Sequence, residues 1–250
     1  MNGFLVLWRK EVTSFVVSPV AYVAGVFFLV VMGFIFWFLA SLLATGAIPG
    51  VSVMNLLFGS PFFWMTQLVI APILTMRSFA EERRTGTFET LLTAPISDAA
   101  VVLAKYMAVL TIYILIWTPT VAYVYVLREF SALEAPVDLG AMAGGYIGAL
   151  LIGMFYLAIG LFCSALTSNQ IIAAISSFAL ILLLFFGGFL DVITHRPGLQ
   201  TLAAILSSHE HMFEFSRGVI DTRPILFHLS GTALLLFATL RALQSRHWKT

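Results

Sequence analysis

Two long stretches without charged residues constrain this chain more than any other feature. No Asp, Glu, Lys or Arg occurs between Val12 and Met76, and none occurs between Leu139 and Leu190. A helix that crosses a membrane needs about 20 consecutive apolar residues, so each stretch can hold two such helices. The whole sequence is 60% hydrophobic and 10% charged, whereas an ordinary soluble domain is roughly a quarter charged. We therefore predict an all-α, polytopic membrane protein.

Breaks in the apolar pattern divide the chain into a single transmembrane domain over residues 1–250, with six expected transmembrane helices. Residues 1–19 predict an N-terminal amphipathic elbow helix that lies at the membrane interface. Residues 20–190 hold spans one to five, which we place at 20–43, 61–76, 99–127 and, on either side of a turn at 167–170, within 139–190. Residues 191–223 form an outer-side loop with a predicted helical pair at 199–206 and 211–220. Residues 224–250 hold the last span, at 225–240, and a basic tail.

The distribution of basic residues predicts the orientation. Six spans place both termini on one side, and that side carries nine of the Lys and Arg residues whereas the other side carries four. Because short cytoplasmic loops are enriched in Lys and Arg, we expect both termini and the loop 77–105 to be cytoplasmic, in a cell (inner) membrane.

The loop 77–105 is the only dense run of charge in the sequence. Ser78 followed by Glu81 fits a capping box, although the same residues could be the tail of the preceding helix. Gly86 interrupts the run, and a short amphipathic helix over 87–93 is predicted after it. Lys105, two turns inside the next span, is expected to extend its side chain back to the headgroups. On these features alone, the loop could also be an interfacial helix lying on lipid.

The segment 79–97 (FAEERRTGTFETLLTAPIS) resembles the first cytoplasmic loop of type-two ABC export permeases. In that family an E-x-R-x-x-G-T-x-E-x-L-x-x-x-P-x-S pattern forms the coupling helix that docks on the ATPase subunit. The residues that carry the pattern, together with Glu82 in the same run, are Glu81, Arg83, Gly86, Thr87, Glu89, Leu91, Pro95 and Ser97. The resemblance implies the permease subunit of an ABC exporter. Its partners would be two copies of an ABC ATPase, which bind the ATP and Mg²⁺, and a second permease copy or a homologous permease.

The sequence lacks the features of several other classes. It has three lysines, none of which follows a glycine, so there is no phosphate-binding G-x-x-x-x-G-K-[ST] loop and the chain is not expected to hydrolyse ATP. No cofactor of its own is expected. No basic run suggests nucleic-acid binding. No Asp, Glu or Arg lies in the middle of a span, which counts against a proton-coupled carrier. An apolar, aromatic-lined path suits an amphiphilic or lipid-like substrate.

The outer-side segment 206–223 (LSSHEHMFEFSRGVIDTR) is similar to the stretch before the last span in the gliding-motility-associated and copper-processing branches of the same family. The candidate residues for an outer-side partner or a gate are His209, Glu210, His211, Glu214 and Arg217. One alternative function is a mechanical relay that passes ATPase strokes to an outer-side or periplasmic protein without moving a solute.

A membrane-integral metalloenzyme is the remaining alternative, with His211 and Glu214 as ligands and His195 or His209 as a third. We expect no metal, because His209 and His211 face different sides of one helix.

Within the fourth span, Gly145, Ala149 and Gly153 recur at i, i+4 and i+8. Such a stripe of small residues lets another helix approach closely. We expect it to serve packing inside the protein rather than a dimer seam.

Overall fold

The computed structural model describes residues 3–44, 53–87, 96–130, 139–189 and 197–245. All regular structure in these ranges is helical, and six of the helices are long and apolar enough to cross a membrane. The prediction of an all-α protein with six transmembrane helices is therefore confirmed. The helices are α1 (Gly3–Val17), α2 (Pro19–Ala44), α3 (Val53–Gly59), α4 (Pro61–Thr75), α5 (Ala80–Thr85), α7 (Asp98–Trp117), η1 (Thr118–Thr120), α8 (Val121–Phe130), α9 (Leu139–Leu166), α10 (Gln170–Gly187), α12 (Pro197–Leu206), α13 (Ser208–Ser216) and α14 (Thr222–Gln244).

Several helices begin where the sequence places a capping residue. The Ser60 hydroxyl accepts a hydrogen bond from the amide of Phe63 at 3.2 Å, directly before the proline that opens α4. Ser97 caps α7 in the same way, and the Asn169 side chain caps α10 after the short turn that follows α9. Each cap satisfies an amide that would otherwise lack a partner in the first helical turn. These caps fix the points at which the apolar segments become spans.

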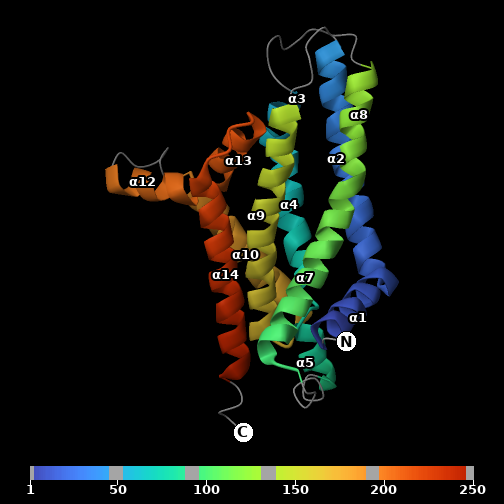
Figure 1. The fold of residues 1–250 in the computed structure, drawn as a ribbon, viewed down its shortest axis with the longest axis vertical. Helices are drawn as coiled ribbons and strands as arrows, with labels where there is room; N and C mark the ends of the chain where they lie inside the picture. The colour runs from blue at the N-terminus through green and yellow to red at the C-terminus, as the bar shows by residue number, and fades with distance from the viewer. Residues whose placement is uncertain (1–2, 45–52, 88–95, 131–138, 190–196, 246–250) are drawn as a thin grey trace.

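The third span contains one irregularity. The α7 helix passes into the short 3₁₀ helix η1, which contains Pro119, and then into α8. Proline lacks an amide hydrogen and its ring crowds the preceding turn, so a local tightening of the helix is expected there. The three elements together extend along α2 (Figure 1).

Helix α9 lies at the centre of the bundle and packs against α4, α7, α10, α13 and α14 (Figure 1). It can do so because it presents small residues to its neighbours. A Cβ at Gly145 would overlap the ring of Phe58, and a Cβ at Gly153 would overlap the ring of Tyr113. The Tyr113 hydroxyl also donates to the carbonyl of Ala149 at 2.9 Å. The small-residue stripe thus packs inside the protein.

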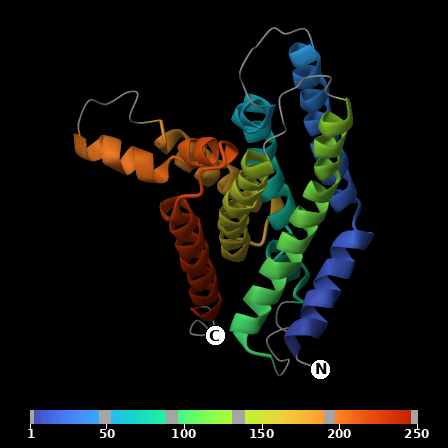
Figure 2. The same ribbon diagram turned by 45° about the horizontal axis from the view of Figure 1, so that its top comes forward.

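The two ends of the bundle differ. The start of α1, helix α5 and the end of α14 lie at one end, so both ends of the described chain are on the same side of the spans (Figure 1). Helix α1 runs obliquely across that end and packs along α7. Near the other end α13 packs on α9 and α3, whereas α12 projects sideways from the bundle (Figure 2). The predicted helix at 199–206 lies within α12, whereas α13 begins and ends earlier than the predicted 211–220. The placement of both helices on the outer side stays a prediction.

Candidate functional site

The turn between α4 and α5 is held by a residue that lies far away in the sequence. The Ser164 hydroxyl, near the end of α9, accepts hydrogen bonds from the amides of Phe79 and Ala80 at 3.1 and 3.2 Å. It also donates to the carbonyl of Met76 at 3.1 Å. Phe79, the N-cap residue of α5, makes no side-chain capping bond of its own. Ser164 therefore takes the role of the cap and fastens the turn to the central helix.

The predicted capping box of Ser78 and Glu81 is wrong. The Ser78 hydroxyl is buried without a hydrogen-bond partner, and the amide of Glu81 bonds to the carbonyl of Arg77. The alternative, in which these residues are the tail of the preceding helix, is borne out in part: residues 61–85 form one candidate span, although a turn at 76–79 separates α4 from α5. A capping box needs the Ser at the N-cap position, and here the helix begins one residue later.

Gly86 ends α5 in the left-handed conformation, with φ 73°. A residue with a Cβ rarely adopts this conformation, so glycine is required for the chain to turn at this point. Thr87 is helical again, and its hydroxyl lies 2.9 Å from that of Thr85. Residues 84–87 are exposed at the end of the molecule. The remaining residues predicted to contact the ATPase, Glu89, Leu91 and Pro95, lie outside the described residues, as does the predicted amphipathic helix beyond Thr87.

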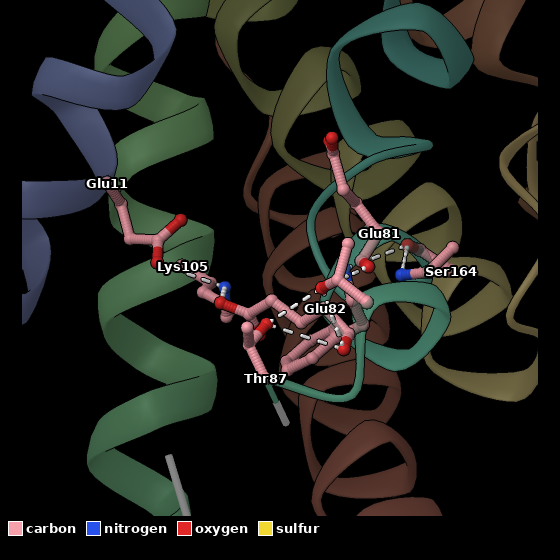
Figure 3. A network of polar contacts seen from close by, with 9 residues as sticks. Glu11, Glu81, Glu82, Thr87, Lys105 and Ser164 are labelled. Atoms are coloured by element: carbon pink, nitrogen blue, oxygen red, sulfur yellow. Dashed lines mark hydrogen bonds and ion pairs between the residues drawn. The ribbon is translucent and has the colours of Figure 1, made fainter. Parts of the chain in front are cut away.

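Lys105 is buried in the protein, so the prediction that it reaches the headgroups is wrong. Its exposed fraction is 2%. The ammonium group donates to Glu82 Oε1 at 2.7 Å and to Glu11 Oε1 at 3.0 Å (Figure 3). It also lies 5.3 Å from the centre of the Phe79 ring. Because α1 and α5 cover this part of α7, protein carboxylates replace the water and headgroups that the side chain would otherwise reach.

The Lys105 triad, defined as Lys105, Glu11 and Glu82, joins three elements that are distant in the sequence. The side chains of Glu11 and Glu82 are only 12% and 19% exposed, so solvent screens these ion pairs weakly. Breaking a buried pair by removing one partner typically costs about 3–5 kcal/mol, since the other charge is left unpaired. A weaker contact, from the Arg77 guanidinium to the Ser18 hydroxyl at 3.5 Å, joins the start of the same loop to the junction of α1 and α2. Helices α1, α5 and α7 are therefore joined by buried ion pairs into one unit.

The predicted group of docking residues is divided by the structure. Glu82 points inward to Lys105, and Glu81 and Arg83 are half-buried. Arg84, Gly86 and Thr87 remain exposed. The described part of the loop thus has an inner side that binds the bundle and an exposed edge.

At the opposite end, α13 carries the predicted outer-side residues. Its N-cap is Ser207, whose hydroxyl accepts from the amide of Glu210 at 3.2 Å. Glu210, Glu214 and Arg217 are exposed, and the Arg217 guanidinium lies 4.3 Å from the centre of the Phe213 ring. Glu210 and Glu214 of α13 and Arg217, its C-cap residue, thus form one exposed charged face.

The two histidines of α13 face different neighbours. His209 packs against the rings of Trp64 and Phe189, with ring centres 5.7 and 5.5 Å away. His211 packs against His228 of α14 at 5.4 Å. Burial lowers the pKa of both α13 histidines, although the charge of Asp221 partly opposes the effect at His211.

His228 was not identified from the sequence. It is fully buried, and neither ring nitrogen has a hydrogen-bond partner. An imidazole within a largely apolar span was the only available signal. Within the described ranges, no three His, Cys, Asp or Glu side chains come together to hold a metal ion. His211, Glu214 and His209 are thus not assembled as ligands, and His195 lies outside these ranges.

The fold defines a multi-pass membrane protein in which a charged loop is anchored to the spans by buried polar contacts. A family model described as ABC-2 family transporter protein matches residues 49–209. This match covers more than half of the chain, so the protein belongs to the ABC-2 transporter family and is the membrane-embedded permease subunit of an ABC transporter, whose partner is an ABC ATPase. No curated protein matches the chain. Membership of the gliding-motility-associated or copper-processing branch stays a prediction.

Proposed function

We propose that this permease couples ATP hydrolysis by a separate ATPase subunit to export, through the loop that contains α5. The observation that supports this proposal most directly is the Lys105 triad. In it, one buried ammonium group binds the carboxylates of Glu11 and Glu82 at 3.0 and 2.7 Å. A loop that only lay on lipid would not need such an anchor. Because of the triad, a force on the loop would be transmitted directly to the transmembrane helices.

Two connections lead from the loop to different helices. Through Lys105, a displacement of α5 reaches α7 and the elbow helix α1. Through the Ser164 hydroxyl, the turn before α5 is connected to α9, the central helix. If the ATPase subunit pushes on the exposed edge of the loop, α7 and α9 would therefore move together.

The assembly follows from this function. Two copies of the chain, or one copy and a homologous permease, would pair with two ATPase subunits. The protein would lie in the inner membrane. The loop and both termini would face the cytoplasm, because the ATPase subunit needs cytoplasmic ATP. The chain itself would bind neither ATP nor Mg²⁺ and would have no enzymatic activity of its own.

Co-purification tests the coupling role. The tagged permease is expressed with its ATPase, and the retained ATPase is measured for the wild type, for Arg84→Glu and for Arg246→Glu. Arg84 lies on the exposed edge of the loop, whereas Arg246 belongs to the C-terminal tail and controls for a change of charge alone. We expect Arg84→Glu to lower retention and Arg246→Glu to leave it unchanged. A wild-type permease that never retains the ATPase would overturn the proposal.

A second candidate is the mechanical relay to an outer-side protein. It is favoured by the exposed charged face of α13 (Glu210, Glu214 and Arg217) and by α12, which projects from the bundle (Figure 2). The reconstituted complex distinguishes the two functions. ATPase stimulation by a periplasmic protein, and by no lipid or small molecule, would support the relay over export.

A further inference from the structure

Two buried histidines join α13 to α14 at the end of the bundle away from α5. The rings of His211 on α13 and His228 on α14 have centres 5.4 Å apart and are nearly perpendicular, at 88°. The start of α14 lies beside α13 at this point (Figure 1). His211 is 8% exposed, whereas His228 is fully buried. Water, and therefore protons, can reach the pair through His211.

The two imidazoles are packed among phenyl rings. The ring centre of Phe227 lies 5.7 Å from that of His211 and 5.2 Å from that of His228, and Phe155 lies 5.7 Å from His228. Both nitrogens of His228 and Nδ1 of His211 have no hydrogen-bond partner among the described residues, so no hydrogen bond joins the two rings. Burial of an unpartnered polar atom costs free energy, and a phenyl ring would fill the same space without this cost. The property that an imidazole adds is titration near neutral pH.

The described elements that pack against α13 bring few charges to His211. Helix α3 contains no titratable residue, and those of α9 are two tyrosines and one cysteine, which are uncharged at neutral and acidic pH. At the start of α14, Asp221 and Arg223 are charged, and the charge of Asp221 acts on His211. The other titratable residues of α13 and its C-cap are His209, Glu210, Glu214 and Arg217.

The neutral and charged forms of His211 fit this contact differently. Burial lowers the pKa of His211 below its ordinary value of 6.5, and the charge of Asp221 partly opposes this effect. The ring is therefore neutral at pH 7. An imidazolium in the same position would lose water while it faced apolar rings and an imidazole to which it makes no hydrogen bond. Outside the contact, water and the carboxylate of Asp221 can satisfy the charge.

Helix α13 has other attachments that depend on neither histidine. The Ser216 hydroxyl donates to Asn55 Oδ1 of α3 at 2.6 Å. The backbone of α13 also approaches α9 so closely that a Cβ at Gly144 would overlap the carbonyl oxygen of Phe215. These contacts hold α13 on α3 and α9, whereas the ring of His211 joins the middle of α13 to α14. Loss of the His211 contact would therefore free the start of α14 and leave α13 in place.

We propose that His211 and His228 form a pH-sensitive latch between α13 and α14. While both rings are neutral, the latch holds the start of α14 against α13. Protonation of His211 opens the latch, because the charged ring turns away from His228 toward water and Asp221. The latch responds to the pH on the side of the membrane where α13 lies. Its opening requires no ATPase, so failure of the latch and failure of the coupling role can be distinguished.

The test measures the distance between α13 and α14 in the full-length chain, in lipid nanodiscs, as a function of pH. Spin labels are attached at Phe213→Cys on α13 and at Leu226→Cys on α14, both exposed positions, after Cys163→Ala removes the native thiol. Label distances are measured by pulsed electron paramagnetic resonance between about pH 8 and pH 5, where imidazoles titrate. We expect one narrow distance at the upper end of this range. A longer and broader distance should replace it, with a midpoint below the ordinary histidine value of 6.5.

Three variants identify the titrating group. His211→Phe keeps a ring in the contact but binds no proton, so it should hold the short distance throughout. Asp221→Asn keeps a side chain that caps α14 but removes the charge that favours the imidazolium, so it should lower the midpoint by roughly 0.5–1 pH unit. His209→Phe is the matched control, because His209 lies on the same helix and faces Trp64 instead of α14. It should leave the midpoint unchanged.

The unlabelled protein gives a second measurement. As the pH falls below 6.5, the wild type should lose thermal stability relative to His211→Phe, because the unfolded chain then binds the proton more readily than the folded chain does. The proposal is overturned if the wild-type label distance does not change with pH, if it shortens on acidification, or if His211→Phe responds as the wild type does. If His211→Phe does not fold, an Asp221→Asn midpoint equal to that of the wild type overturns it.

Discussion

Replacing Lys105 by methionine tests the main structural claim, that the loop is anchored to the spans by a buried charge. Methionine keeps most of the apolar stem but removes the ammonium group. The Glu11 and Glu82 carboxylates would then face each other without a cation, at a separation no larger than the sum of their 3.0 and 2.7 Å distances to the lysine nitrogen. At an effective dielectric constant of about 20, two like charges at roughly 5 Å repel by roughly 3 kcal/mol. Measured losses for one member of a buried pair are about 3–5 kcal/mol.

We expect Lys105→Met to lower the stability of the permease by about 3 kcal/mol and to uncouple the loop. Stability is measured as the thermal transition of the detergent-solubilised protein, and coupling as transport per ATP hydrolysed in the reconstituted complex. Adding Glu82→Gln to Lys105→Met should restore about half of the lost stability, because one of the two opposed charges is removed. Glu82→Gln alone should cost less than Lys105→Met, since the ammonium group keeps its bond to Glu11.

The reasoning is refuted if Lys105→Met has the thermal transition and the coupling ratio of the wild type. It is also refuted if the double variant is no more stable than Lys105→Met, because the two substitutions would then act independently. Lys10→Met is the control for loss of a lysine, since Lys10 is an exposed residue of α1.

Three further substitutions test other contacts. Ser164→Ala should cost about 1–3 kcal/mol for each backbone amide that it leaves without a partner. Ser230→Ala, whose exposed hydroxyl donates to the carbonyl of Phe227 in its own helix, should be nearly neutral by the same thermal assay. Gly153→Ala should destabilise by about 1–3 kcal/mol, because its Cβ overlaps a buried tyrosine ring; Gly187→Ala, where no atom lies within 4 Å, should cost far less. His228→Leu should be neutral or stabilising, because both ring nitrogens are buried without partners. A loss above about 2 kcal/mol would show that the imidazole has a partner, such as bound water.

Much of the fold was predictable because the signals are local. The charge-free stretches indicated four of the six spans, and the residues that end the apolar segments indicated the limits of the spans to within a few positions. The signal for the break at Gly86 was also local. A left-handed residue that ends a short helix is usually glycine, so the glycine itself indicated where the helix ends. Small residues at helical spacing predicted the close approach of α9 to its neighbours, although not the identity of Phe58 and Tyr113 as the rings that fill the gaps.

The contacts that build the sites were not predictable, because they join segments distant in the sequence. Ser164 lies 85 positions from Phe79, whose amide it binds. In the sequence, Ser164 is a serine near the end of a span, and nothing around it indicates that it binds the turn before α5. His211 and His228 meet only because α13 and α14 both pack against α9, which brings the two imidazole rings together. In each case the pattern around a single residue indicates its secondary structure but not its partner.

Lys105 illustrates why a correct general rule gave a wrong result. A lysine inside an apolar span extends to water when water is within reach of its stem, and the sequence shows two turns between Lys105 and the loop. The rule fails here because α1 and α5 occupy that space and each brings a carboxylate. The excess of carboxylate over ammonium has a further consequence. Either Glu11 or Glu82 can move away without leaving the buried cation unpaired, whereas loss of both would. The triad can therefore yield at one contact at a time, and the proposed coupling role requires this property, because the anchor would have to transmit movement and stay attached.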